Sequence, residues 1–178
     1  FTLLFNFLFM KKSLQAFKLG CISVFVLLMS LQAFGQITNT ESFDGTTFVP
    51  SGWTNFLTSG NNTWTRVTSG TSPTCATHSG AGMAKFNSYS ANGGVRSIIT
   101  PSFNMAGNAS GSIVSFWMYR DNGYGTTADR VDVMYNTSLT TVGAISLGTI
   151  NRAIGLSPSV AANGWYQYSF TIPSAVQS

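Results

Sequence analysis

The stretch Ser112-Ile-Val-Ser-Phe-Trp-Met-Tyr119 decides the fold of this chain. Side chains alternate between the two faces of an extended strand, so Val114 and Phe116 share one face while Ile113 and Trp117 share the other. Both faces are largely apolar. This pattern predicts a central β-strand that is buried on both sides.

Further runs of the same kind flank this stretch, and Gly, Asn, Ser and Pro clusters separate them. Alternation along Arg130–Tyr135 and Trp165–Ile172 puts apolar or aromatic residues on one face and mostly polar residues on the other. The other runs that we predict as strands are Thr40–Phe43, Asn62–Val67, Gly82–Phe86, Val95–Thr100 and Gly143–Ile150. Because no segment has a helical period, we expect an all-β domain of two antiparallel sheets packed face to face.

The length and the charge of the chain limit the classes of protein to which it can belong. The 178 residues fit one domain with a targeting segment, and only 8% of them are charged, against about 25% in a typical soluble domain. Lys11, Lys12 and Lys18 precede Gln36, so the net charge of +4 falls to about +1 for the remainder, six basic residues against five acidic ones. The sequence therefore contains no basic patch for nucleic acid, and its scarcity of Glu and Lys excludes a coiled coil.

The N-terminal region has the pattern of a secretory signal peptide. Lys11 and Lys12 form a positive start, the apolar run Leu19–Leu31 follows, and Ala33-Phe-Gly35 offers small residues for cleavage before Gln36. This run is shorter than the roughly 20 residues that span a bilayer. We therefore predict upstream residues 1–9, a signal peptide at 10–35 and a secreted or cell-surface domain at 36–178, with no membrane insertion after cleavage.

The catalytic and metal-binding residue types are scarce. After Gln36 the sequence has one cysteine, Cys75, and one histidine, His78, which are too few for a disulfide or for a structural zinc site. A Ser-His-Asp triad would depend on His78, and no Gly-x-Ser-x-Gly motif accompanies it. Asp129 and Asp132 flank one strand too closely for a glycosidase pair. We predict that the protein is not an enzyme.

Several motifs, taken in order, resemble the cleaved-adhesin and choice-of-anchor J domains of secreted bacterial proteins. They are Glu41-Ser-Phe-Asp-Gly45, Pro50-Ser-Gly-Trp53, His78-Ser-Gly-Ala-Gly-Met-Ala-Lys-Phe86, Ile99-Thr-Pro-Ser102, Val114–Asp121, Asp129-Arg-Val-Asp-Val133 and Gly164–Pro173. The resemblance implies a jelly-roll sandwich related to MAM domains and to galactose-binding-like carbohydrate modules. It also implies a non-catalytic extracellular module attached to peptidases or adhesins. The closing strands of that family have no counterpart here, so we expect a domain incomplete at its C-terminus and further domains in the full-length protein.

Structural Ca²⁺ is the one cofactor that the resemblance implies. Jelly-roll modules of this kind often hold it beside the first strand, where Glu41 and Asp44 stand. Calcium takes 6–8 oxygen ligands, and two carboxylates supply only part of that shell. The alternative is that Glu41 is a solvated edge residue and that Asp44 forms a turn before Gly45. The sequence leaves both interpretations open.

Aromatic residues are the remaining candidates for a site. We assign Trp53 and Trp117 to packing, because large rings dominate sandwich interiors. Tyr89 and Tyr124 lie among Gly, Asn and Ser, so we predict exposed rings in ligand-binding loops. The resulting hypothesis is an adhesion module for a glycan or protein surface. The alternative is a structural accessory domain or spacer beside a secreted peptidase or glycosidase.

Overall fold

The computed structural model of this chain describes residues 38–89, 93–105, 111–123, 125 and 129–173. The chain divides into two units, Phe1–Thr38 and Asn39–Ser178, and the described residues belong almost entirely to the second. The signal peptide predicted at residues 10–35 and the upstream residues 1–9 lie outside the described ranges. No helix within those ranges is long and apolar enough to cross a membrane.

Every regular element in the described ranges is a β-strand, as the sequence predicts. The strands are β1 (Thr54–Ser59), β2 (Trp64–Val67), β3 (Ser69–Thr71), β4 (Thr74–Ala76), β5 (Met83–Phe86), β6 (Val95–Ile99), β7 (Ser112–Arg120), β8 (Arg130–Tyr135), β9 (Ile145–Asn151) and β10 (Gly164–Ile172). All of them pair antiparallel, as β1 with β6, β2 with β5, β3 with β4, β7 with β10 and β8 with β9.

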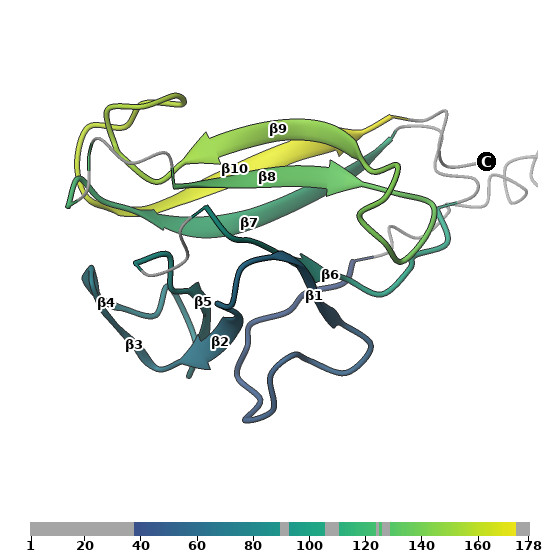
Figure 1. Ribbon diagram of the computed structural model, residues 1–178, viewed down its shortest axis with the longest axis horizontal. Coiled ribbons are helices and arrows are strands. Elements are labelled where there is room, and N and C mark those ends of the chain that lie inside the picture. The colour runs from purple at the N-terminus through teal and green to yellow at the C-terminus, as the bar shows by residue number, and fades with distance from the viewer. Residues whose placement is uncertain (1–37, 90–92, 106–110, 124, 126–128, 174–178) are drawn as a thin grey trace, which may run out of the picture. The chain divides into compact units, whose positions relative to one another are not determined.

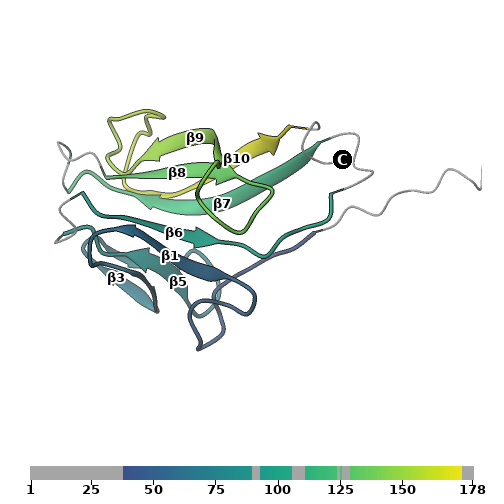
Figure 2. The same cartoon turned by 45° about the vertical axis from the view of Figure 1, so that its right-hand side comes forward.

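The pairs gather in two layers, as in a β-sandwich. Figures 1 and 2 both show β1 to β6 in one layer and β7 to β10 in the other. The longest pair is β7 with β10, whose register runs without interruption from Gly164 opposite Arg120 to Ile172 opposite Ser112. This long antiparallel ribbon positions most of the residues that form the candidate site.

The strand predictions succeed where apolar residues alternate. Arg130–Tyr135 forms β8 with the predicted bounds, and its side chains alternate between exposed and more buried positions. The prediction of a strand at Thr40–Phe43 is wrong, because the structure has no regular element there. The sequence analysis also missed β1, β3 and β4, in which apolar residues do not alternate regularly, and β3 and β4 are only three residues each.

The prediction that both faces of β7 are buried is wrong. Ile113 is 70% exposed and Trp117 is 43% exposed, although both are apolar. The opposite face carries Phe116, which stacks on Phe170 of β10 with ring centroids 6.3 Å apart. The β7–β10 ribbon therefore has one packed face and one partly open face.

A buried arginine fastens the end of β7 to the loop that follows β9. Arg120 has no exposed surface. Its guanidinium donates to the carbonyl oxygens of Arg152, Ala153, Leu156 and Pro158 and to the hydroxyl of Tyr168, with donor–acceptor distances of 2.5–3.0 Å. Because a buried charge is costly unless it is fully hydrogen-bonded, this set of acceptors is what permits Arg120 to lie inside the domain.

Candidate functional site

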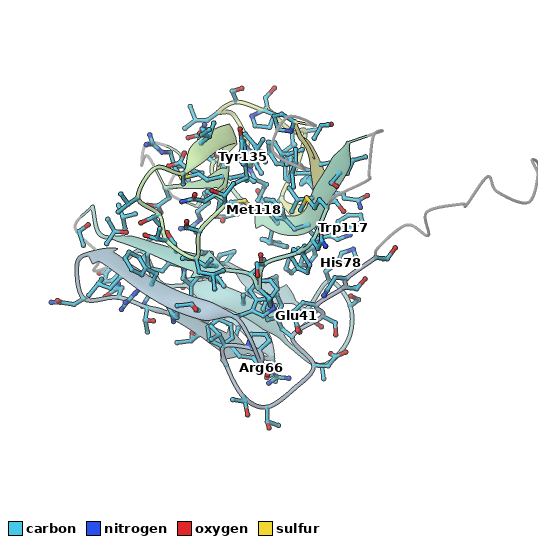
Figure 3. The ribbon with its side chains drawn as sticks, turned by 90° about the vertical axis from the view of Figure 1, so that its right-hand side faces the viewer. Glu41, Arg66, His78, Trp117, Met118 and Tyr135 are labelled. Atoms are coloured by element: carbon cyan, nitrogen blue, oxygen red, sulfur yellow. The ribbon has the colours of Figure 1, made fainter. Side chains whose placement is uncertain are left out.

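An aromatic cluster joins the two layers at one end of the β7–β10 ribbon. His78, from the loop after β4, stacks on Trp117 of β7 with ring centroids 3.9 Å apart and planes at 19°. Figure 3 shows these two side chains together. Trp165 of β10 meets His78 edge-on at 5.7 Å, and its indole Nε1 donates to the Ala76 carbonyl at 3.1 Å. Tyr119 contacts Trp165 edge-on at 5.6 Å, so the rings are held on several sides.

The exposed side of the ribbon continues away from this cluster. We name it the Trp117 face, and it consists of Ile113, Ser115 and Trp117 on β7 and of Gln167, Ser169 and Thr171 on β10. Each residue on β7 lies directly opposite one on β10, Trp117 facing Gln167. None of these six side chains carries a charge. The face thus presents one large fixed ring beside amide and hydroxyl groups.

A polar hollow lies beyond the cluster, where β7 ends and β10 begins. We name it the Asp121 hollow, and it is lined by Ser72, Pro73, Asp121, Gly123, Arg152 and Asn163. Arg152 binds the Asp121 carboxylate through two nitrogens, Nε to Oδ2 at 2.8 Å and Nη2 to Oδ1 at 3.1 Å. The Gly123 amide also donates to Asp121 Oδ1, at 2.7 Å. The hollow is therefore built around a two-point ion pair.

The ion pair holds both groups in their charged forms. Burial acts to raise the pKa of Asp121, but hydrogen bonds from Arg152 and Gly123 outweigh it, so the pKa lies below its ordinary value. Burial acts to lower the pKa of Arg152, and the bonds to Asp121 outweigh this effect, so that pKa is raised. Arg152 Nη1 also lies 3.5 Å from Asp129 Oδ2. The hollow thus stays ionised over the physiological pH range.

The predicted ligand residue Tyr89 lies beside this charge network. Tyr89 is 85% exposed, as expected for a residue whose ring faces solvent. The preceding residue, Ser88, donates from Oγ to Asp129 Oδ2 at 2.7 Å, which ties the Tyr89 loop to the segment that follows the Asp121 hollow. The other predicted ligand residue, Tyr124, lies outside the described residues.

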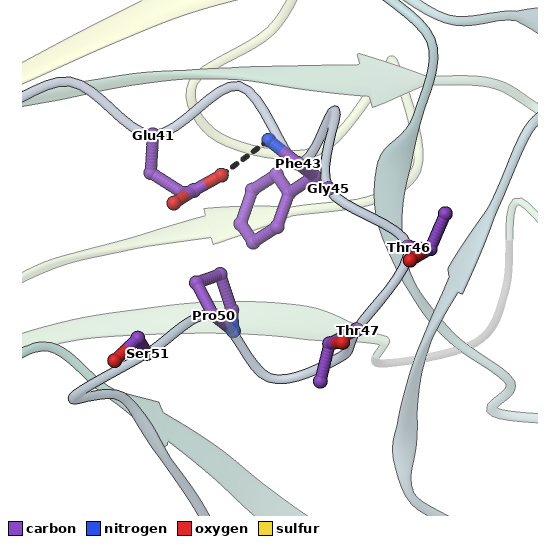
Figure 4. A pocket seen from close by; sticks show the side chains of 7 residues that line it. All are labelled: Glu41, Phe43, Gly45, Thr46, Thr47, Pro50 and Ser51. Carbon is purple, nitrogen blue, oxygen red and sulfur yellow. Dashed lines mark hydrogen bonds between the residues drawn. The ribbon is translucent and has the colours of Figure 1, made fainter.

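The predicted metal ligands Glu41 and Asp44 belong to a loop before β1. Glu41 Oε1 accepts a hydrogen bond from the backbone nitrogen of Phe43 at 2.5 Å, as Figure 4 shows. Phe43 has a φ of 57°, a left-handed conformation that is costly for a side chain of this size. Its ring contacts Trp53 edge-on at 5.9 Å, which places Trp53 in packing, as predicted.

Asp44 and Arg66 organise the other side of this loop. The Asp44 carboxylate accepts hydrogen bonds from the Ala81 amide and from the Ser42 hydroxyl, the latter at 2.8 Å. These two bonds lower the pKa of Asp44, the Ala81 amide most. The Arg66 guanidinium donates to the carbonyl oxygens of Phe43, Asp44 and Ala81 at 2.6, 3.2 and 2.9 Å.

These contacts do not fit calcium in the Glu41–Asp44 loop. Carbonyl and carboxylate oxygens are the ligands that calcium needs, and here three carbonyls accept from Arg66 while both Asp44 oxygens accept from protein donors. A divalent cation beside the Arg66 guanidinium would also be repelled. Among the described residues, no three His, Cys, Asp or Glu side chains gather closely enough to hold a metal ion. The calcium hypothesis stays a prediction that would require this loop to rearrange.

Sequence reasoning missed the Asp121–Arg152 pair and placed Trp117 in the core. Arg152 follows Asp121 by 31 positions in the chain, and no local spacing indicates their contact. The alternation in β7 correctly placed Trp117 on the face opposite Phe116, but it could not show whether another layer covers that face. Burial raises the pKa of the Cys75 thiol, which disfavours the reactive thiolate at neutral pH.

Together, the two-layer fold and these sites define an all-β domain with a fixed aromatic platform and a polar hollow on one ribbon. The chain matches no protein-family model, and comparisons with curated proteins and with solved structures likewise give no match.

Proposed function

We propose that this chain is a non-catalytic extracellular module that attaches a secreted bacterial protein to a glycan or protein surface. The observation that carries the proposal is that Trp117 is 43% exposed on an uncharged strand face. Tryptophan is usually highly buried, so a half-exposed ring that is fixed by neighbours has the character of a binding platform.

The surroundings of Trp117 favour a ligand with both apolar and hydroxyl surfaces. His78 supports the indole by stacking, so little side-chain freedom remains to be lost on binding. Gln167 stands directly opposite Trp117, and Ser115 and Ser169 form the next pair along the ribbon. A pyranose ring offers an apolar face for stacking and hydroxyl groups for these polar neighbours. A partner protein with an exposed aliphatic side chain fits the same face.

The charged residues support a binding role over catalysis. Asp121 and Asp129 both pair with Arg152, and Asp132 pairs with Arg130 at 3.1 Å and accepts from Thr149 at 2.6 Å. Carboxylates whose oxygens already accept hydrogen bonds from arginines are not positioned to transfer a proton to a substrate. The resemblance to cleaved-adhesin and choice-of-anchor J domains, with their jelly-roll fold, and the predicted signal peptide agree with an extracellular module. The loops of Tyr89 and Tyr124 remain a proposed part of the contact surface.

A structural accessory role beside a peptidase or glycosidase is the second candidate. Ile113, which is 70% exposed at the far end of the Trp117 face, favours it, because an apolar strand face can pack against an adjoining domain. Under this role the same face would be covered within the full-length protein, and no outside ligand would bind it.

The test is an array of glycans and extracellular-matrix proteins probed with the wild-type domain and with the Trp117→Ala variant. We expect Trp117→Ala to weaken binding by about fivefold or more, as loss of an aromatic anchor costs above about 1 kcal/mol. Met134→Ala is the control, because Met134 is 49% exposed and lies on β8. Binding that is equal in the two variants would remove the Trp117 face from the site. No bound partner on the array would favour the accessory role.

A further inference from the structure

The Trp117 face and the Asp121 hollow lie one after the other along the direction of strand β7. Trp117, Tyr119 and Asp121 alternate on β7 and just past its end, so they follow one side of the chain over about 13 Å at roughly 3.3 Å per residue. On the neighbouring strand Trp165 lies opposite Tyr119, and Asn163 immediately precedes β10. An oligosaccharide of a few units spans such a distance.

One short segment borders both ends of this path. His78 stacks on Trp117, the Ala76 carbonyl accepts from Trp165, and Ser72 and Pro73 line the Asp121 hollow. Residues 72–78 therefore partly cover the middle of the path and leave an opening at each end. Trp117 occupies one opening, and the polar groups of the hollow occupy the other.

The polar groups of the hollow are suited to hydroxyl groups. The Asp121 carboxylate accepts from Arg152 and Gly123 and its side chain is only 4% exposed, so it organises the hollow, and the groups open to a ligand are those of Asn163 and Ser72. Asn163 accepts from the Asn122 backbone through its side-chain oxygen at 3.2 Å, which leaves its NH₂ group to donate. The Ser72 hydroxyl is exposed on the same rim. A sugar hydroxyl both donates and accepts, so two neighbouring hydroxyls match the Asn163 NH₂ donor and the Ser72 hydroxyl, which can donate or accept.

The charges around the hollow disfavour an anionic ligand. Arg152 directs its guanidinium at Asp121 and Asp129, and Arg120, next to Asp121, is fully buried against carbonyl oxygens. An anion would have to displace a carboxylate from Arg152 before it could bind there. Lys85 of β5 is a further cation near this rim, and it donates to Thr71 at 3.4 Å. Its contact with an anion would be screened by solvent, since exposed pairs contribute little.

From these contacts we infer that the Asp121 hollow is a second subsite of the proposed binding module and takes two neighbouring hydroxyl groups of an uncharged sugar. The inference rests on the proposed binding function. A neutral oligosaccharide would place one ring on Trp117 and another sugar unit in the hollow.

The experiment measures the affinity of the domain for neutral hexasaccharides, namely cellohexaose, xylohexaose and mannohexaose, and for anionic hexagalacturonate. Asn163→Ala and Ser72→Ala remove groups from the rim, and Asn61→Ala and Ser138→Ala are the matched controls on exposed loops elsewhere. We expect a neutral probe to bind and each rim variant to weaken it about fivefold, because one neutral hydrogen bond contributes about 1 kcal/mol. Hexagalacturonate should bind more weakly than the best neutral probe.

The outcomes separate this inference from the proposed function. Binding that Trp117→Ala abolishes and that both rim variants leave unchanged would overturn the second subsite alone. Tighter binding of hexagalacturonate than of any neutral probe, lost in Lys85→Met, would overturn the ligand class. No binding of any hexasaccharide would overturn the inference, and the matrix-protein array would then decide whether the proposed function is correct.

Discussion

The imidazole of His78 lies parallel to the indole of Trp117, with ring centroids 3.9 Å apart, and this stack joins a loop of one layer to a strand of the other. Neither residue is buried. A contact between two exposed rings that are 39 positions apart in the chain must be held by the strands beneath it.

Replacing His78 with Ala should release the Trp117 ring while leaving the fold intact. We expect a loss of about 0.5–1.5 kcal/mol in the free energy of unfolding, the usual contribution of an aromatic pair. The emission of Trp117 should change as well, since one side of the indole becomes open to water. Fluorescence spectra and urea melts measure both effects. In a Trp117→Phe background the same His78→Ala change should alter the emission less, because only the edge-on contact with Trp165 is then lost, and an equal spectral change there would contradict the assignment to Trp117.

Arg120 and Arg130 are a matched pair for testing how much a buried arginine contributes to stability compared with an exposed one. Arg120→Ala leaves the carbonyls of Ala153, Leu156 and their neighbours without a donor, and we expect a loss of about 3–5 kcal/mol or failure to fold. The side chain of Arg130 is 56% exposed and pairs with Asp132, so Arg130→Ala should change stability by less than about 1 kcal/mol. Urea unfolding of both variants measures the difference. Equal losses would show that the Arg120 network does not stabilise the fold.

The stability of the domain should fall in acid because of Asp121. Its folded-state pKa is below the ordinary value of 3.8, so the ion pair with Arg152 stabilises the fold fully above about pH 4. That stabilisation is lost as the pH falls from this range through the lower folded-state pKa. A ¹³C NMR titration of the Asp121 carboxyl measures the pKa directly. A value at or above 3.8 would contradict the geometry of the pair.

Arg66 should hold the Glu41–Asp44 loop in place of a metal ion. Arg66→Met removes the donors to Phe43, Asp44 and Ala81, and we expect a lower Tm. Addition of millimolar Ca²⁺ or of EDTA should leave the wild-type Tm unchanged, because the loop oxygens already have protein partners. Calorimetric scans measure both effects. A saturable rise in Tm with Ca²⁺ that Glu41→Gln abolishes would instead support the calcium hypothesis.

Export should remove the N-terminal segment. Secreted material should begin at or near Gln36, because Ala33 and Gly35 present small residues at the −3 and −1 positions of the cleavage site. Edman sequencing or mass spectrometry of the exported protein measures this end. Recovery of an uncleaved chain that begins at Met10 from the membrane fraction would overturn the predicted signal peptide.

The amino-acid sequence by itself determined the strands that alternate clearly. The faces of β8 and of β10 follow from their residues, because a side-chain period of two is a local property of an extended chain. The exposure of Tyr89 followed likewise from the polar residues around it in the sequence.

Only the tertiary structure decided which residues meet. Alternation separates Trp117 from Phe116, but the arrangement of the two layers determines that His78 stacks on Trp117 and that Trp117 stays half exposed. The Asp121–Arg152 pair likewise depends on the end of β7 lying beside the loop after β9, where a parallel bridge joins Asp121 to Ala153. The Arg66 contacts that argue against calcium bring together three segments distant in the chain. Each of these contacts is set by the packing of whole strands, which the local sequence pattern does not encode.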